Sequence, residues 1–222
     1  LTPRAKANIE SYLNGRSIVY YAAWMDFNRT DPPMDVTRDW HVDYWTDDMR
    51  TDANGNPAPP CSVSQIKRIV SEMGDFRTLS DSLVTINIKY LTHLVGDMHC
   101  PGHVFYDGQK QFEFKENGKN MRFHGYFDKA FPRFHKGKTA DQFYDGYRRL
   151  TKAEIEELCK GDMESWVRAA EPTFRECYTL LSPTIDYKDL PEQNKTRIKE
   201  IADRLMVEAG YRLAEVMNRI FK

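Results

Sequence analysis

Residues 79–103 read LSDSLVTINIKYLTHLVGDMHCPGH, and this stretch decides which fold we expect. Up to residue 98 its apolar side chains recur at the spacing of one helix face: Leu83, Ile86, Tyr90, Leu94 and Met98. Pro101-Gly102 then breaks the helix and turns the chain. The stretch therefore predicts an amphipathic helix that leads directly into a turn with two histidines, His99 and His103.

Helical signals also lie on both sides of this stretch. Thr2 is a good N-cap, Pro3 suits the first helical position, and Gly15 marks the end of an opening helix. Residues 62–73 and 198–220 repeat apolar side chains every three or four positions, which predicts two further helices.

The remaining segments differ in character. We expect a helix over residues 17–24 and a long irregular connection over 31–60, which is rich in Asp, Pro, Gly, Asn and Thr. Residues 109–121 surround an Asn-Gly pair and predict a small hairpin. Together these signals predict a mainly α fold, organised as a single domain over residues 1–222.

Composition limits the kind of partner. With 222 residues and a formal net charge of −1, the chain can bury one sizeable core but has no long-range positive field to attract nucleic acid. A polyanionic substrate would therefore need local cations, which a metal cluster supplies. No apolar run is long enough to span a membrane. The four cysteines are compatible with two disulfides in an exported protein or with four thiols.

Two His-x-x-x-Asp pairs point to metal chemistry. His93 and Asp97 stand four apart in the predicted helix, and His124 and Asp128 repeat that spacing. Residues four apart share a helix face, so each pair can direct an imidazole and a carboxylate at one ion. A single His-x-x-x-Asp pair is usually a surface contact. Two pairs suggest more than one metal, the usual arrangement for phosphoester hydrolysis.

Other residues join this pattern or stand apart from it. His99 and His103 follow the first pair, while Asp26 and His41 precede it. His135 has no acidic neighbour in the sequence, and we expect an ordinary surface residue. The aromatic residues Trp40, Tyr44 and Trp45 adjoin His41, where either packing or base stacking would explain them.

The stretch from His93 to His103 resembles the His-x-x-Gly-Asp-x-His-x-Pro-x-His signature of the S1/P1 nuclease family. His124 to Asp128 is similar to the later His-x-x-x-Asp element of the family, and Trp24-Met25-Asp26-Phe27-Asn28-Arg29 to its earlier Trp-x-Asp-x-x-Arg element. The opening Leu-Thr-Pro-x-Ala and the closing Ala-Gly-Tyr-Arg-Leu-Ala also look like family features, so the resemblance covers nearly the whole chain.

The resemblance implies a helical fold shared with bacterial zinc phospholipase C, with three zinc ions in a cleft. Matching motif positions assign one zinc to Asp26, His41 and His93, and a second zinc to His103, His124 and Asp128. Asp97 would bridge toward the third zinc, and Asp97 and Arg29 are the candidate catalytic residues. His99 would support a ligand without binding metal itself. Independently of the resemblance, Tyr44 and Trp45 are candidates for contact with substrate, because they lie in the aromatic group beside His41.

The implied activity is hydrolysis of single-stranded nucleic acid or 3′-nucleotides by metal-activated water, by an exported, monomeric enzyme. Two differences from the family pattern bear on this implied activity. The N-terminal tryptophan and nearby histidine that complete the family's third zinc site are absent here, so we expect two zincs or fewer and poor activity from this chain. Cys100 and Val42 also differ from the residues usual in the nucleases. A phospholipase C-like phosphoesterase and a non-catalytic zinc-containing binding protein remain alternatives.

Overall fold

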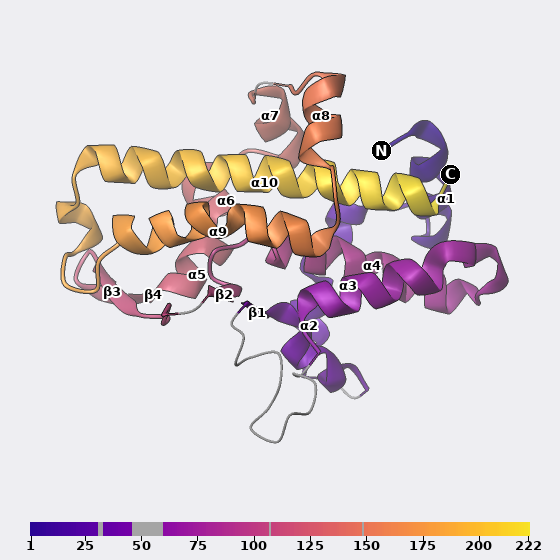
Figure 1. Ribbon diagram of the computed structural model, residues 1–222, viewed down its shortest axis with the longest axis horizontal. Coiled ribbons are helices and arrows are strands. Elements are labelled where there is room, and N and C mark those ends of the chain that lie inside the picture. Colours follow the sequence, from indigo (N-terminus) through magenta and orange to yellow (C-terminus); the bar gives the residue numbers. More distant parts are fainter. Residues whose placement is uncertain (31–32, 46–59, 107, 148) are drawn as a thin grey trace. The chain divides into compact units, whose positions relative to one another are not determined.

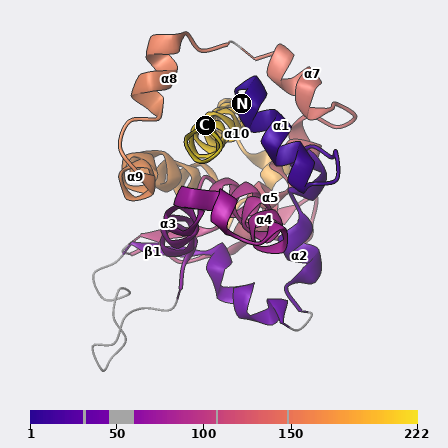
Figure 2. The same cartoon turned by 90° about the vertical axis from the view of Figure 1, so that its right-hand side faces the viewer.

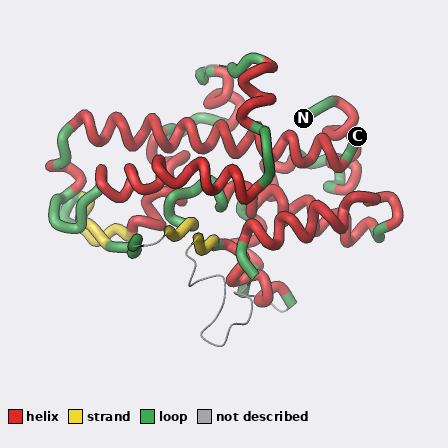
Figure 3. The backbone as a smooth tube through the Cα atoms, in the orientation of Figure 1, coloured by secondary structure: helices red, strands yellow, loops and turns green. Residues whose placement is uncertain are grey.

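The computed structural model describes residues 1–30, 33–45, 60–106, 108–147 and 149–222. The chain is mainly helical, as the sequence predicts, and its strands are few and short (Figure 3). Two two-stranded sheets, β1 with β2 and β3 with β4, are the sheets among these residues. No helix in the described ranges combines the length and the apolarity needed to cross a bilayer.

The described residues form two compact units. The first takes its residues from the ranges Leu1–Asp43, Asp48–Met98 and Ala209–Lys222, and the second from Tyr44–Asp47 and His99–Glu208. The helix α10 contributes residues to both. The organisation as a single domain over residues 1–222 stays a prediction.

The first unit contains the opening helices, the central helix α4 and the end of α10. Its elements are α1 (Pro3–Tyr12), η1 (Ile18–Tyr21), α2 (Trp24–Asn28), η2 (Met34–His41), α3 (Ser62–Glu72), η4 (Met73–Thr78) and α4 (Asp81–Asp97). The Thr2 hydroxyl accepts from the backbone N–H of Ala5 and so caps α1 as predicted. The termini lie close together in Figures 1 and 2. Near them, the backbone N–H of Thr2 donates to the Asn218 side chain at 2.8 Å.

Helix α4 is more deeply buried than an amphipathic helix with one apolar face. Every residue from Tyr90 to Val95 is buried, and Val84 and Ile88 are fully buried a turn or two earlier. The helix packs along α3, which lies beside it in both ribbon views (Figures 1 and 2). The sequence stripe placed the helix correctly, and its Tyr90, Leu94 and Met98 are buried. Its Leu83 and Ile86 are only partly buried, whereas the fully buried Val84 and Ile88 were missed.

Two expectations for the first unit were wrong in detail. The predicted helix over residues 17–24 is a short 3₁₀ helix, η1, followed by a separate helix, α2, that begins at Trp24. The predicted irregular connection contains the 3₁₀ helix η2 over Met34–His41, while residues 46–59 lie outside the described part. Short 3₁₀ turns lack the long apolar repeat that makes a helix visible in sequence.

The second unit surrounds an aromatic core. Its complete elements are β2 (Val104–Tyr106), β3 (Glu113–Glu116), β4 (Lys119–Arg122), α5 (Phe123–Asp128), α6 (Ala130–Phe134), α7 (Ala140–Asp145), α8 (Lys152–Leu158), α9 (Met163–Leu180) and η5 (Tyr187–Asp189). Two elements belong to it in part: β1 (Asp43–Trp45), from Tyr44 onward, and α10 (Glu192–Ile220), as far as Glu208. Phe114, Phe123, Tyr126 and Phe174 are fully buried within it.

The predicted hairpin is confirmed as β3 and β4. Glu113 pairs with Arg122 and Glu116 with Lys119, so Asn117-Gly118 forms a two-residue turn. Both turn residues have positive φ, 52° and 76°, the conformation that an Asn-Gly turn adopts readily. The Asp186 carboxylate accepts from the backbone N–H groups of both residues, which fixes the turn from a distant part of the chain.

Candidate metal centre

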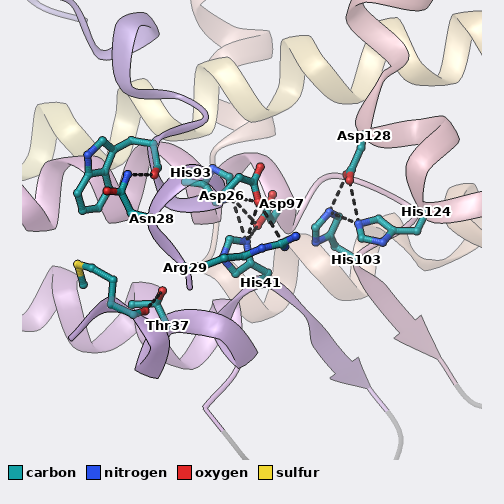
Figure 4. Close-up of polar contacts among 12 residues, drawn as sticks. Asp26, Asn28, Arg29, Thr37, His41, His93, Asp97, His103, His124 and Asp128 are labelled. Atoms are coloured by element: carbon teal, nitrogen blue, oxygen red, sulfur yellow. Dashed lines mark hydrogen bonds and ion pairs between the residues drawn. The ribbon is translucent and has the colours of Figure 1, made fainter. Parts of the chain in front are cut away.

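Four side chains from three elements of the first unit converge at one point, which we call the first cluster: Asp26, His41, His93 and Asp97. Asp26 comes from α2, His41 ends η2, and His93 and Asp97 share one face of α4 (Figure 4). The predicted i, i+4 pair therefore does meet, and the two earlier residues join it.

Distances within the first cluster suit a small cation. His41 Nδ1 lies 2.9 Å from Asp97 Oδ2 and 3.0 Å from His93 Nε2, and His93 Nε2 lies 3.2 Å from Asp97 Oδ2. Asp26 Oδ1 is 3.9 Å from both imidazole nitrogens. Tetrahedral zinc with ligands about 2.0–2.2 Å away requires ligand atoms about 3.3–3.6 Å apart. Nitrogen and oxygen donors at this spacing fit zinc.

The orientation of His93 is set by the main chain. Its Nδ1 lies 2.7 Å from the carbonyl oxygen of Ala22, an acceptor, so Nδ1 must donate. In the neutral imidazole the lone pair is then on Nε2, which points into the first cluster. A carbonyl partner on the far nitrogen is the usual support for a metal-binding histidine.

Burial and charge act on His93 in opposite directions. Burial disfavours the imidazolium, but the carboxylate of Asp97, together with Ala22 and Asp26, outweighs it and raises the pKa of His93 to about 9. Without a metal the first cluster therefore holds a proton on His93. A metal ion would have to displace that proton on binding.

Three side chains of the second unit form the second cluster: His103, His124 and Asp128. His103 Nε2 lies 2.7 Å from Asp128 Oδ1 and 2.9 Å from His124 Nε2, and His124 Nε2 lies 3.0 Å from Asp128 Oδ2 (Figure 4). Burial would raise the pKa of Asp128, but the two imidazoles outweigh it and hold that pKa well below its ordinary value. The donor set again suits zinc.

Gly102 allows the two histidines of the second cluster to approach. A Cβ atom added at Gly102 would lie 2.7 Å from His124 Cα and 3.1 Å from the His124 ring. No side chain larger than hydrogen fits there without moving the backbone of α5. The sequence marked Gly102 as part of a turn, but only the structure shows this close approach.

Gln111 links the two segments that carry the second cluster. Its amide nitrogen donates to the carbonyl of Gly102, at 3.2 Å, and to the Tyr178 hydroxyl, at 2.9 Å. Its amide oxygen accepts from the backbone N–H of His124, at 3.1 Å. Nothing in the sequence indicated this role, because each partner is at least nine positions away.

The other predicted site residues lie as follows. Arg29 is half-exposed, with Nη1 3.6 Å from Asp26 Oδ1, so it adjoins the first cluster. His99 is buried and belongs to neither group of closely spaced ligand atoms among the described residues. Tyr44 and Trp45 lie on β1, which pairs with the strand that follows His103; their side chains lie outside the described part.

The expectation for His135 was wrong. It is buried, with Nε2 2.6 Å from Asp203 Oδ1 and its ring centroid 4.6 Å from that of Phe143. Asp203 lies on α10, 68 positions further along the chain, so the acidic partner was invisible in the local sequence. The pair is a packed structural contact between α10 and the segment after α6.

A mainly helical chain with two clusters of imidazoles and carboxylates is the kind of protein in which bound metals perform hydrolysis. The family model of S1/P1 Nuclease matches residues 1–222, so the chain belongs to the S1/P1 nuclease family, whose members hydrolyse phosphodiester bonds. None of the curated proteins compared with the chain matches it.

Proposed function

We propose that this chain is a zinc-dependent phosphodiesterase that hydrolyses single-stranded nucleic acid or 3′-nucleotides. The observation that carries the proposal is the convergence of four side chains in the first cluster and three in the second, at spacings that suit zinc. Membership of the family supports the same reaction.

The residues of the two clusters would bind zinc, and Asp97 would also position the neighbouring ligands. Asp26, His41, His93 and Asp97 would hold one zinc, and His103, His124 and Asp128 another. When bound, zinc lowers the pKa of water and neutralises the charge of a phosphate. Asp97 Oδ2 contacts both imidazoles of the first cluster and so holds their nitrogens in position.

Arg29 is the candidate for stabilising the transition state. It is half-exposed and lies beside the equally exposed Asp26, so its guanidinium can reach a substrate without leaving the first cluster. A planar guanidinium matches two phosphoryl oxygens at once, and its positive charge offsets the negative charge that develops during hydrolysis.

A pocket beside the second cluster favours a nucleotide over a lipid. It has a volume of about 310 Å³ and is lined by Gln111, Phe112, Glu113, Arg122 and His124. The aromatic ring of Phe112 offers stacking and the exposed guanidinium of Arg122 offers hydrogen bonding, which a nucleotide uses and a fatty acyl chain does not. We also expect the enzyme to act after export, as members of the family typically do.

A substrate panel tests the proposal. The zinc-loaded protein is assayed on single-stranded DNA, single-stranded RNA, 3′-nucleotides and phosphatidylcholine, beside an Asp97→Asn variant and an Asp35→Asn control at an exposed site in η2. We expect turnover of the nucleic acids or nucleotides that Asp97→Asn abolishes and Asp35→Asn retains. Turnover of phosphatidylcholine alone, or no turnover with both clusters loaded, would contradict it.

A further inference from the structure

Cys100 is brought to the second cluster by the turn that follows α4. The backbone N–H of His103 donates to the carbonyl of Cys100 at 2.9 Å, closing a four-residue turn with Pro101 at its second position. Proline favours that position because its fixed φ suits the turn. The first and last residues of the turn, Cys100 and His103, are therefore close in space.

The thiol lies among the ligand atoms of the second cluster. Cys100 Sγ is 3.7 Å from Asp128 Oδ1, and ligand atoms of Cys100, His103 and Asp128 all lie within 4.8 Å of one another. Zinc binds sulfur at about 2.3 Å and nitrogen or oxygen at about 2.0–2.2 Å, so sulfur and oxygen in one tetrahedral shell stand about 3.5 Å apart. The observed separation fits a shared ion.

From this geometry we propose that Cys100 is a ligand of the metal held by the second cluster, together with His103, His124 and Asp128. The inference rests on the proposed function, since it requires that the second cluster binds a metal. Cys100 is partly exposed rather than buried, so a small side-chain rotation is enough to complete the shell. Binding transfers the thiol proton to solvent and leaves the thiolate on the ion.

A thiolate would change which metal the second cluster prefers. Two imidazoles and a carboxylate accept several divalent ions, whereas a soft sulfur ligand favours zinc and cadmium over magnesium and manganese. It would also fill a coordination position at the second cluster. The first cluster, which has no cysteine among its four residues, would keep a nitrogen and oxygen shell.

Cobalt spectroscopy separates the two clusters. Co²⁺ is added to the metal-free full chain, and its absorption is recorded for the unmodified protein, Cys100→Ser and Cys61→Ser. Cys61 is a matched control because it is also partly exposed but lies in the first unit, before α3. We expect a thiolate-to-cobalt charge-transfer band in the unmodified protein and in Cys61→Ser, and no such band in Cys100→Ser.

Cadmium affinity gives a second, independent measurement. Loss of a residue that only supports a metal ligand weakens metal affinity roughly 10- to 100-fold. Cys100→Ser removes a ligand itself, so it should weaken binding of one Cd²⁺ per chain by more than that. Cys61→Ser should leave the cadmium affinity unchanged. Circular dichroism confirms that each variant is folded. Cobalt bound with no thiolate-to-cobalt band, or a band that survives in Cys100→Ser, would overturn the assignment of Cys100 as a ligand but not the proposed function. Failure to bind any cobalt would instead contradict the proposed function.

Discussion

Gly102 lies where the turn after α4 passes closest to His124. The 2.7 Å between an added Cβ and His124 Cα is shorter than real side chains tolerate, and the obstructing atom is backbone. Any substitution must therefore move His124, whose Nε2 is one of the three donors of the second cluster.

We expect Gly102→Ala to destabilise the fold by about 1–3 kcal/mol, the usual cost of overpacking, and to weaken metal binding at the second cluster. Gly96→Ala is the matched control, because Gly96 lies exposed in α4 with nothing within 4 Å of an added Cβ. That change should stabilise the helix by about 0.5–1 kcal/mol. Chemical denaturation and zinc titration measure both effects. Equal behaviour of the two variants would refute the close-approach argument.

Arg29 offers a test of catalysis that leaves the ligands intact. We expect Arg29→Ala to lower kcat by roughly 10²- to 10³-fold, the range found when one donor to a developing charge is lost. Arg29→Lys should restore little of the rate, since a lysine ammonium cannot match two phosphoryl oxygens with a planar fork. Steady-state kinetics on single-stranded DNA, with metal content measured in parallel, would show this. A change in KM with kcat unchanged would point to substrate binding instead.

At the scale of elements, the two clusters differ in how they are built. The first takes Asp26 from α2 and His41 from η2, and its other two residues are aligned by the helical repeat of α4. The second depends on a turn, a hairpin and a short helix, α5, that are held together by Gln111. Removing that amide should affect the second cluster and spare the first.

For Gln111→Leu we expect a loss of about 1–3 kcal/mol in unfolding free energy, because its part-buried partners are left without a hydrogen bond. We also expect a roughly 10- to 100-fold weaker metal affinity at one of two sites. Tyr178→Phe removes one partner of the same amide and should have a smaller effect. Calorimetric titration with zinc distinguishes one weakened site from two. Equal weakening of both sites would contradict the assignment of Gln111 to the second cluster.

The elements also show what sequence alone could predict. Helix α4, the terminal helix, the cap of α1 and the Asn-Gly hairpin were predictable, since each depends on local periodicity or turn chemistry. The ligand candidates were found by motif. Gln111, the carbonyl of Ala22 and the burial of His135 were not, because their partners lie far away in the sequence. The short 3₁₀ helices η1 and η2 lack a repeat long enough to detect.

At the scale of the whole molecule, metal content is the simplest measurement. Two clusters predict two tightly held zinc ions per chain, and Asp128→Asn should reduce this to one. Because ions bind the folded protein, saturation at about 100 times the dissociation constant should add about 2.7 kcal/mol of stability per site. Elemental analysis and thermal unfolding with and without a chelator would test this. Three tightly held zincs per chain would contradict the prediction.

The metal-free protein should also respond to pH. A histidine whose folded pKa is raised stabilises the fold fully below its unfolded pKa, near 6.5, and loses that contribution as pH rises through the folded value. For His93 that value is about 9, so the metal-free protein should lose stability between pH 6.5 and 9. Zinc affinity should rise over the same range, because fewer protons compete. Unfolding curves of the unmodified protein and His93→Gln at several pH values measure the difference.

Asp186 holds the Asn117-Gly118 turn from η5's N-cap, and the hairpin that this turn closes runs directly into Phe123 and His124. A partly exposed acid with no part in the chemistry thereby helps to set the register of a strand that ends two residues before His124. Substituting Asp186 during surface redesign would risk a protein that still folds but binds a metal ion weakly at the second cluster.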